Sequence, residues 1–207
     1  MRTTPTQDEW NARTVALLED AYLAAPDSRG GSGFNGDAAR WQRARRVIVS
    51  AIDRDGSFLD VGCANGLLLE SVVEWTAKDG YRVQPHGLEL SERLAQRARQ
   101  RLPHWTSRIN VGDVTRWQPP QRYDFVRCEM EVAPEHQRHD LVQRCLRDLV
   151  APDGRLILCN YGSTTEPAAP LVPSLRWWGF EVAGSAEASE NGTVITRVAW
   201  IDHRTAP

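Results

Sequence analysis

The sequence has no long apolar run, and this absence excludes the protein classes that depend on one. No segment of the 207 residues approaches the roughly 18 consecutive apolar residues of a membrane-spanning helix. Residues 1–10, MRTTPTQDEW, also lack the apolar stretch of a secretory signal. We therefore expect a cytoplasmic protein that does not associate with membranes.

Cysteine is scarce, and no two cysteines have the C-x-x-C spacing. The four residues are Cys63, Cys128, Cys145 and Cys159. Such wide spacing indicates neither a zinc ribbon nor a redox dithiol, so we expect reduced, mostly buried thiols. His136 and His139 are three residues apart, but no HExxH motif accompanies them, so no metal site is expected.

A strongly basic charge is also missing. The formal net charge is -2, whereas nucleic-acid binding depends largely on a basic surface. Two arginine-rich segments, 40–46 and 93–101, could form a phosphate-binding stripe, but arginines spread through helical segments are more often a solvated helix face. We do not expect a nucleic-acid partner, although RNA stays open as an alternative substrate. No feature of the sequence indicates an oligomeric state.

What the sequence does contain, from residue 56 onward, is an alternation of short β-prone runs with helical segments. The expected strands are 57–62, 86–90, 108–112, 123–129 and 155–161, and the expected helices between them are 65–75, 91–102 and 134–150. This alternation is typical of βαβ units and predicts a parallel sheet.

The two ends of the chain complete the predicted fold. Residues 180–188 and 193–203 are predicted as an antiparallel hairpin, while residues 1–55 are predicted as two helices joined by a glycine-rich segment. We expect one structural domain of the α/β class. It would have a Rossmann-like, seven-stranded, mostly parallel sheet with an antiparallel C-terminal hairpin and helices on both faces. Residues 1–55 would form a helical lid or cap, and residues 56–207 the ligand-binding domain.

The strongest local motif is FLDVGCANG, residues 58–66, an apolar strand that ends near Asp60 and continues through a glycine turn into a helix. Gly62 and Gly66 would let a ligand approach the strand end closely, and the following helix presents unpaired N–H groups. The pattern indicates a nucleotide-like cofactor, although it lacks the third spaced glycine of G-x-G-x-x-G.

Acidic residues follow two further expected strands. Glu89 ends the second strand, where a carboxylate can accept hydrogen bonds from both hydroxyls of a ribose, and Asp113 follows the third. Because ligands of open α/β sheets bind at the carboxyl ends of the strands, Asp60, Glu89 and Asp113 are predicted to line one site.

With these motifs, residues 37–202 resemble the class I S-adenosylmethionine-dependent methyltransferases. The resemblance implies S-adenosylmethionine as the cofactor and S-adenosylhomocysteine as its product. The implied cofactor residues are Asp60, Gly62, Cys63, Ala64, Asn65 and Gly66 at the methionine part, Glu89 at the ribose, and Leu90, Asp113 and Val114 at the adenine. Ala64 departs from the family, in which many members have glycine, and we expect the extra methyl group to be tolerated.

A physical argument at Asp60 favours this family over the dehydrogenases, since a carboxylate there would repel a pyrophosphate but suit a cationic sulfonium. The resemblance implies methyl transfer. The short connections between the strands leave little room for a macromolecule, so we expect O- or N-methylation of a small metabolite or natural product. The alternatives are a small RNA methyltransferase and a non-catalytic S-adenosylmethionine-binding protein on the same fold.

Glu129 and Glu131, at the end of the fourth expected strand, are the candidate catalytic residues. Alternation along an extended strand would place both on one side, with Met130 opposite. One carboxylate could then hold the acceptor while the other takes its proton, and Glu129 would also contact the cofactor. Asn160 and Tyr161, at the end of the fifth expected strand, are candidates for orienting the acceptor.

The glycine-rich segment before residue 37 is a candidate hinge. We expect Phe34 or Trp41 to close over cofactor and acceptor as the N-terminal lid moves, because lids that exclude water are common around reactive cofactors. The alternative is that the N-terminal helices are simply packed on the sheet.

Overall fold

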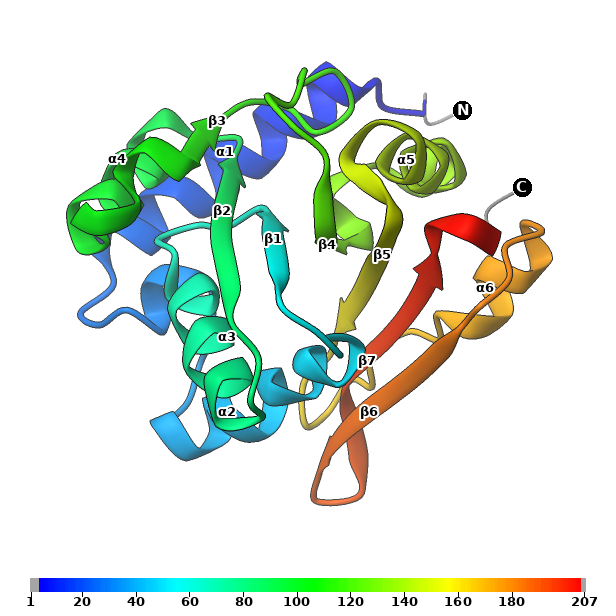
Figure 1. Cartoon of the computed structure of the whole chain (residues 1–207). Coiled ribbons are helices and arrows are strands. Elements are labelled where there is room, and N and C mark those ends of the chain that lie inside the picture. The colour runs from blue at the N-terminus through cyan, green and yellow to red at the C-terminus, as the bar shows by residue number, and fades with distance from the viewer. Residues whose placement is uncertain (1–3, 206–207) are drawn as a thin grey trace.

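Seven strands form one sheet at the centre of the structure (Figure 1). The structure is a computed structural model that describes residues 4–205. The strands are β1 (Gly56–Val61), β2 (Val83–Glu89), β3 (Ile109–Val111), β4 (Tyr123–Glu129), β5 (Val150–Tyr161), β6 (Gly184–Glu190) and β7 (Thr193–Asp202). Their order is β3-β2-β1-β4-β5-β7-β6, with β1 to β5 parallel and β7 antiparallel to both β5 and β6. The predicted Rossmann-like, mostly parallel sheet with its antiparallel C-terminal hairpin is confirmed.

Helices cover both faces of this sheet, as predicted. The α-helices are α1 (Gln7–Ala24), α2 (Ala38–Arg45), α3 (Leu67–Lys78), α4 (Glu92–Arg101), α5 (Arg138–Arg144) and α6 (Val172–Trp177). Short helices of other types are η1 (Gly30–Ser32), η2 (Arg46–Ala51), η3 (Pro103–Arg108), η4 (Met130–Val132), η5 (Glu135–Gln137), η6 (Cys145–Leu149) and η7 (His203–Thr205). Side chains of α2, η2, α3 and α4 pack against one face, and those of α5, η6 and α6 against the other.

Strand β1 shows why the sheet needs cover on both sides. Its successive residues Phe58 and Leu59 are fully buried but belong to different cores, because side chains alternate between the faces of a strand. A strand buried on both faces reads as a continuous apolar run, which is the pattern in this sequence.

Three predicted elements differ clearly in extent from those observed. The helix expected over 134–150 is divided into η5, α5 and the π-helix η6, and β5 begins directly at Val150 instead of at residue 155. The register between β4 and β5 shifts after Val150, so the strand absorbs residues 151–154 as an irregularity. The strand expected from residue 180 begins at Gly184, since Gly179, with φ +88°, ends α6 and Phe180 enters the core.

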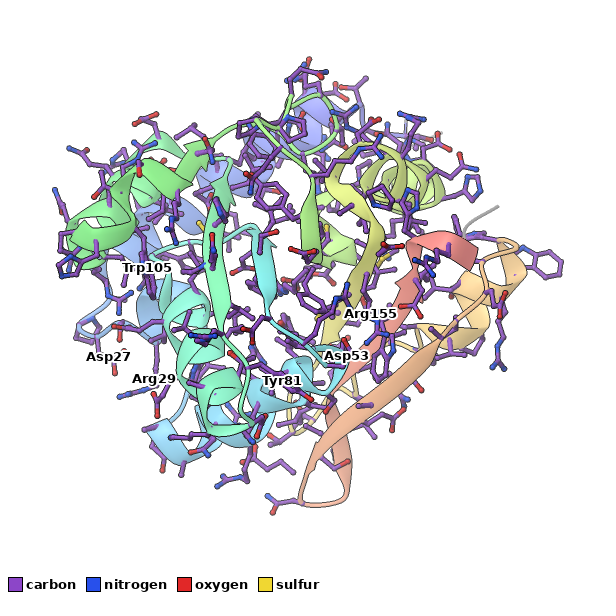
Figure 2. All side chains as sticks on the ribbon, viewed as in Figure 1. Asp27, Arg29, Asp53, Tyr81, Trp105 and Arg155 are labelled. Atoms are coloured by element: carbon purple, nitrogen blue, oxygen red, sulfur yellow. The ribbon has the colours of Figure 1, made fainter. Side chains whose placement is uncertain are left out.

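The glycine-rich segment 26–36 is folded against the domain. Arg29 Nη2 lies 2.6 Å from Asp27 Oδ2 within the segment (Figure 2). Gly31 is buried, and a Cβ atom there would collide with the side-chain amide of Asn65. The glycine at this position is therefore needed for close contact with the loop after β1.

The first 55 residues differ among themselves in how firmly they are attached. None of the α1 residues is buried, whereas Ile48 and Ala51 of η2 are completely buried in the core. After η2, Asp53 lies 3.2 Å from Arg155 of β5, which also pairs with Asp202 of β7 at 2.6 Å (Figure 2). Within this segment, α1 is thus the part that can move without disturbing the core.

Candidate functional site

A cavity of about 750 Å³ lies at the carboxyl ends of the parallel strands, and α1 forms one of its walls. The predicted residues that line it are Asp60, Gly62, Cys63, Ala64, Glu89, Leu90, Asp113, Val114, Glu129, Glu131, Phe34, Trp41 and Tyr161. Its size is that of a small-molecule site, and its position is where open α/β sheets bind their ligands.

The loop after β1 turns sharply under this cavity. Gly62 and Gly66 adopt φ +75° and +78°, and Ala64, between them, adopts φ +46°, a left-handed conformation that is unusual for a residue with a Cβ atom. A Cβ atom on Gly66 would also collide with Leu102. The sequence G-C-A-N-G therefore encodes a tight turn that brings backbone to the cavity.

Glu89 holds this loop from the end of β2. Its Oε2 accepts a hydrogen bond of 2.7 Å from the backbone N–H of Ala64, and its Oε1 accepts one of 3.0 Å from the N–H of Ser91. Burial raises the pKa of Glu89 above its ordinary value, although these backbone donors favour the charged form. Each oxygen keeps a second lone pair with which it can bind a ligand in the cavity.

Asp113, after β3, is bound to the N-terminal helix. Its Oδ2 accepts a hydrogen bond of 2.9 Å from Asn11 Nδ2 of α1, and its Oδ1 accepts one of 2.9 Å from the N–H of Thr115. Leu90 and Val114 add apolar surface at the same end of the cavity. A carboxylate beside two apolar side chains suits a polar ring system such as a purine.

Helix α1 also reaches the other side of the cavity mouth. Trp10 Nε1 donates a hydrogen bond of 2.9 Å to the carbonyl oxygen of Glu131, and Gln7 Nε2 donates one of 3.1 Å to that of Val132. Together with the contact to Asp113, these bonds place α1 between the ends of β3 and β4. This is the position that a lid would occupy, and the motion of the lid stays a prediction.

A charged cluster lies between β1, β4 and β5. Arg127, a buried arginine in β4, donates hydrogen bonds to Asp60 Oδ1 at 3.0 Å, to the carbonyl of Val61 at 3.2 Å and to the hydroxyl of Tyr161 at 2.6 Å. Burial raises the pKa of Asp60 to about 6, even though the neighbouring guanidinium favours its charged form. Sequence reasoning missed Arg127, yet an arginine inside the apolar run YDFVRCE was a visible signal of a buried charge.

The two candidate catalytic acids both line the cavity, but their surroundings differ. Glu129 is partly buried at the end of β4, 3.6 Å from Arg127 Nη2, and burial raises its pKa. Glu131 lies in η4 and is exposed. Both acids thus lie on the cavity side and Met130 is buried in the core, as predicted, but the reason differs from the predicted one, because the strand ends at Glu129 and the chain continues as a helical turn.

Phe34 and Trp41 form a fixed aromatic wall. Their rings contact edge to face with centroids 5.1 Å apart, and Trp41 Nε1 donates a hydrogen bond of 2.9 Å to Ser71 Oγ of α3. Arg45, the last residue of α2, stacks beside them and on Tyr161, with its Cζ atom 3.6 Å from the tyrosine ring centroid. Arg45 lies in the arginine-rich segment expected to face solvent, and its place in the cavity was not predicted.

Three predicted site residues do not line the cavity. The side chain of Asn65 bonds to the carbonyl of Ser28 at 2.8 Å and to Ser32 Oγ at 2.7 Å, so it joins the N-terminal segment to the loop. Gly66 contributes to the turn of that loop through its positive φ angle and packs against Leu102. Asn160 donates to the carbonyl of Ala169 at 3.0 Å and is directed away from the site.

Over residues 4–205, no helix is both long enough and apolar enough to cross a membrane. Within the same range, no three His, Cys, Asp or Glu side chains are grouped as metal ligands.

Known proteins share part of this sequence and the fold of the whole chain. Residues 58–154 match a family described as a methyltransferase domain. Among the curated proteins, none matches the sequence. The Burkholderia thailandensis 1,6-didemethyltoxoflavin-N1-methyltransferase, solved with bound 1,6-didemethyltoxoflavin and S-adenosylhomocysteine, is similar over 98% of this chain and 92% of its own, at 17% identity and a TM-score of 0.68.

Two further solved structures share the fold. The cyclase SpnF is similar over 96% of this chain and 97% of its own, at 15% identity and a TM-score of 0.63. The glycopeptide N-methyltransferase MtfA, complexed with S-adenosyl-L-homocysteine, is similar over 80% of this chain and 89% of its own, at 15% identity and a TM-score of 0.56. At these identities the likeness shows the fold.

Proposed function

We propose that this chain transfers a methyl group from S-adenosylmethionine to an oxygen or nitrogen atom of a small molecule. Residues 58–154 match a family of methyltransferase domains, and the fold is that of the class I enzymes. The observation that carries the proposal is the convergence of Asp60, Glu89 and Asp113 on one cavity, each at or beside the end of a neighbouring strand.

The residues present fit this cofactor. Glu89 has free lone pairs for the ribose hydroxyls, Asp113 lies beside apolar Leu90 and Val114 at the far end, and Asp60 supplies negative charge below the glycine loop. When bound, S-adenosylmethionine supplies a methyl group made electrophilic by its positively charged sulfur. An acidic cavity favours such a cation. Both the B. thailandensis neighbour and MtfA were solved with S-adenosylhomocysteine, which supports the choice of cofactor.

Two contributions to the reaction come from the chain itself. The wall formed by α1 and the loop 26–36 covers one side of the cavity and would hold the reacting groups together, which is the main requirement of a displacement reaction. Glu129, whose pKa is raised by burial, lies at the end of β4 where it can accept the proton that the acceptor atom releases.

A small acceptor suits a cavity of about 750 Å³. The cavity is bounded on one side by α1, which is bonded to the ends of both β3 and β4, so a polynucleotide would have to displace the helix. The net charge of -2 also disfavours RNA. The B. thailandensis neighbour is described as a methyltransferase of 1,6-didemethyltoxoflavin, and MtfA as a glycopeptide N-methyltransferase.

The rival hypothesis is a protein that binds the cofactor but does not transfer its methyl group, since SpnF has this fold and is described as a cyclase. Similar folds support different reactions, so cofactor binding alone does not establish methyl transfer.

The test uses S-adenosylmethionine labelled on its methyl group, incubated with the protein and a small-molecule extract of the source cells. We expect one labelled small molecule to form with the wild-type protein and to be lost in Glu89→Ala. Labelled RNA in a parallel incubation would favour the RNA reading. Binding of S-adenosylhomocysteine without any labelled product would favour a non-catalytic or non-methylating protein.

A further inference from the structure

Arg45 lines the cavity, but its guanidinium makes no hydrogen bond or ion pair among the residues that the structure describes. Two other arginines that line the cavity are matched by acids. Arg40 Nε lies 2.6 Å from Glu190 Oε2, and Arg127 Nη1 lies 3.0 Å from Asp60 Oδ1. Arg45 is partly buried, and its charge is close enough to that of Glu129 for the two to attract each other, but the two groups do not form an ion pair.

Aromatic rings surround this guanidinium. Its Cζ atom lies 3.6 Å from the ring centroid of Tyr161, 5.0 Å from that of Phe34 and 5.5 Å from that of Trp41. Aromatic faces stabilise a planar cation without using its N–H donors. The rings therefore hold the group in place and leave its hydrogen-bonding edge available to a ligand.

The cage is also rigid. Phe34 and Trp41 are buried, Trp41 is bonded to Ser71, and the hydroxyl of Tyr161 accepts the hydrogen bond from Arg127. A cation held in one orientation before a ligand arrives loses little freedom on binding, which is the condition for a selective site.

The sheet order separates this cation from the residues assigned to the cofactor. Glu89 and Asp113 lie at β2 and β3, on one side of β1, whereas Tyr161 ends β5, two strands to the other side of β1. The cavity thus has acids over β2, β3 and β4, where Glu129 lies, and, over β5, a partly buried arginine without an ion pair within residues 4–205. Arg13, which also lines the cavity without such a partner among the described residues, is an exposed residue of α1. With the cofactor along β1 to β3, the space near Arg45 is the space left for the acceptor.

We infer that the methyl acceptor is an anion whose acidic group, a carboxylate or an equivalent planar oxyanion, binds the edge of the Arg45 guanidinium within the ring cage of Phe34, Trp41 and Tyr161. This inference rests on the proposed function, because it assigns the substrate class of the same site. A planar, bidentate acid matches a guanidinium better than a neutral group does, and the aromatic walls suit a flat acceptor.

The experiment measures ligand binding to protein saturated with S-adenosylhomocysteine, so it does not require the natural acceptor. The probes are benzoate and indole-3-carboxylate, each compared with its uncharged amide, by ligand-observed NMR titration. We expect wild-type protein to bind the carboxylates about tenfold more tightly than the amides, and Arg45→Met to lose this preference. Arg45→Gln provides a second variant if Arg45→Met does not fold.

Arg43→Met is the matched control, because Arg43 is on the same helix but its side chain is 56% exposed. It should keep the preference for carboxylates. The inference is overturned if wild-type protein does not distinguish carboxylate from amide, or if both Arg45 variants keep the distinction.

A third result would reassign the site to the carboxylate of the cofactor. In that case Arg45→Met would weaken S-adenosylhomocysteine but not 5′-methylthioadenosine, which lacks the amino-acid part. If the wild-type protein does not bind S-adenosylhomocysteine at all, the proposed function is contradicted instead. The two failures are therefore distinguishable.

Discussion

The backbone N–H of Ala64 donates a hydrogen bond of 2.7 Å to Oε2 of Glu89, which joins the loop after β1 to the end of β2. The same carboxylate accepts from the N–H of Ser91, so it fixes two segments of backbone beneath the cavity. Because Ala64 adopts φ +46°, this contact helps to hold a strained turn in the conformation that lines the site. The residue assigned to the ribose therefore also organises the loop.

We expect Glu89→Ala to weaken the binding of S-adenosylhomocysteine by about 2 to 3 kcal/mol, since it removes a charged acceptor for the ribose hydroxyls. Calorimetry measures this change. Glu92→Ala, at an exposed carboxylate in α4, is the control and should leave the affinity unchanged. An unaltered affinity in Glu89→Ala would show that Glu89 does not bind the ribose.

Ala64→Gly should be neutral or slightly stabilising, within about 1 kcal/mol, because relief of the left-handed strain offsets the greater freedom of glycine in the unfolded chain. Ala64→Val should lose about 2 kcal/mol or more, since a β-branched residue is poorly tolerated at positive φ. Urea denaturation gives both values. Ala77→Gly, at an exposed position of α3, is the control and should lose about 1 kcal/mol. A loss that large in Ala64→Gly would contradict the assigned strain.

The sheet and the placement of the three strand-end acids around one cavity were predictable because their signals are local in the sequence. Apolar runs identify the strands, and the position of Asp60, Glu89 and Asp113 at strand ends brings them together once the sheet is parallel. No knowledge of side-chain packing is needed for that step.

The region around Arg45, where we propose that the acceptor binds, depends on details that the sequence does not specify. Of the arginines in segment 40–46, Arg43 and Arg46 pair with acids at the surface while Arg45 enters the cavity. Which of them faces inward depends on how α2 packs and where it changes into η2. The position of the Glu131 side chain likewise depends on the residue at which β4 ends, and the residue types in a sequence specify strand ends poorly.

The stability of the protein should depend on pH through Asp60. Its pKa is raised from 3.8 to about 6 in the folded state, so the folded protein binds this proton more tightly than the unfolded chain does. The contribution of this proton to the free energy of unfolding is therefore fully present below about pH 4 and is lost as the pH rises through about 6. Relative to Asp60→Asn, the wild-type free energy of unfolding should fall by about 3 kcal/mol over that window. Parallel pH curves for the two proteins, measured by urea denaturation, would contradict this.

Glu129→Gln should lower kcat by about 100-fold once the acceptor is known, because it removes the proposed base. In the wild-type protein kcat should rise with pH as Glu129 loses its proton, and this dependence should disappear in the variant. Glu131→Gln, at the exposed acid, should have a smaller effect on kcat. If both variants keep the wild-type turnover and pH profile, neither carboxylate is the base.

Helix α1 is predicted to act as a lid over the bound cofactor. It has no buried residue, and hydrogen bonds from Gln7, Trp10 and Asn11 attach it to the ends of β3 and β4. Asp8, Glu19 and Asp20 add ion pairs with Arg116 and Arg93, but these pairs lie at the surface and contribute little, so the helix can open at a modest cost in free energy. Saturation with S-adenosylhomocysteine should slow amide hydrogen exchange in α1 and leave α5, which does not line the cavity, unchanged. Replacing both Trp10 with Phe and Asn11 with Ala should speed release of the ligand about tenfold, since two hydrogen bonds are lost. Equal exchange in α1 with and without ligand, together with an unchanged release rate, would show that the helix is only a static wall.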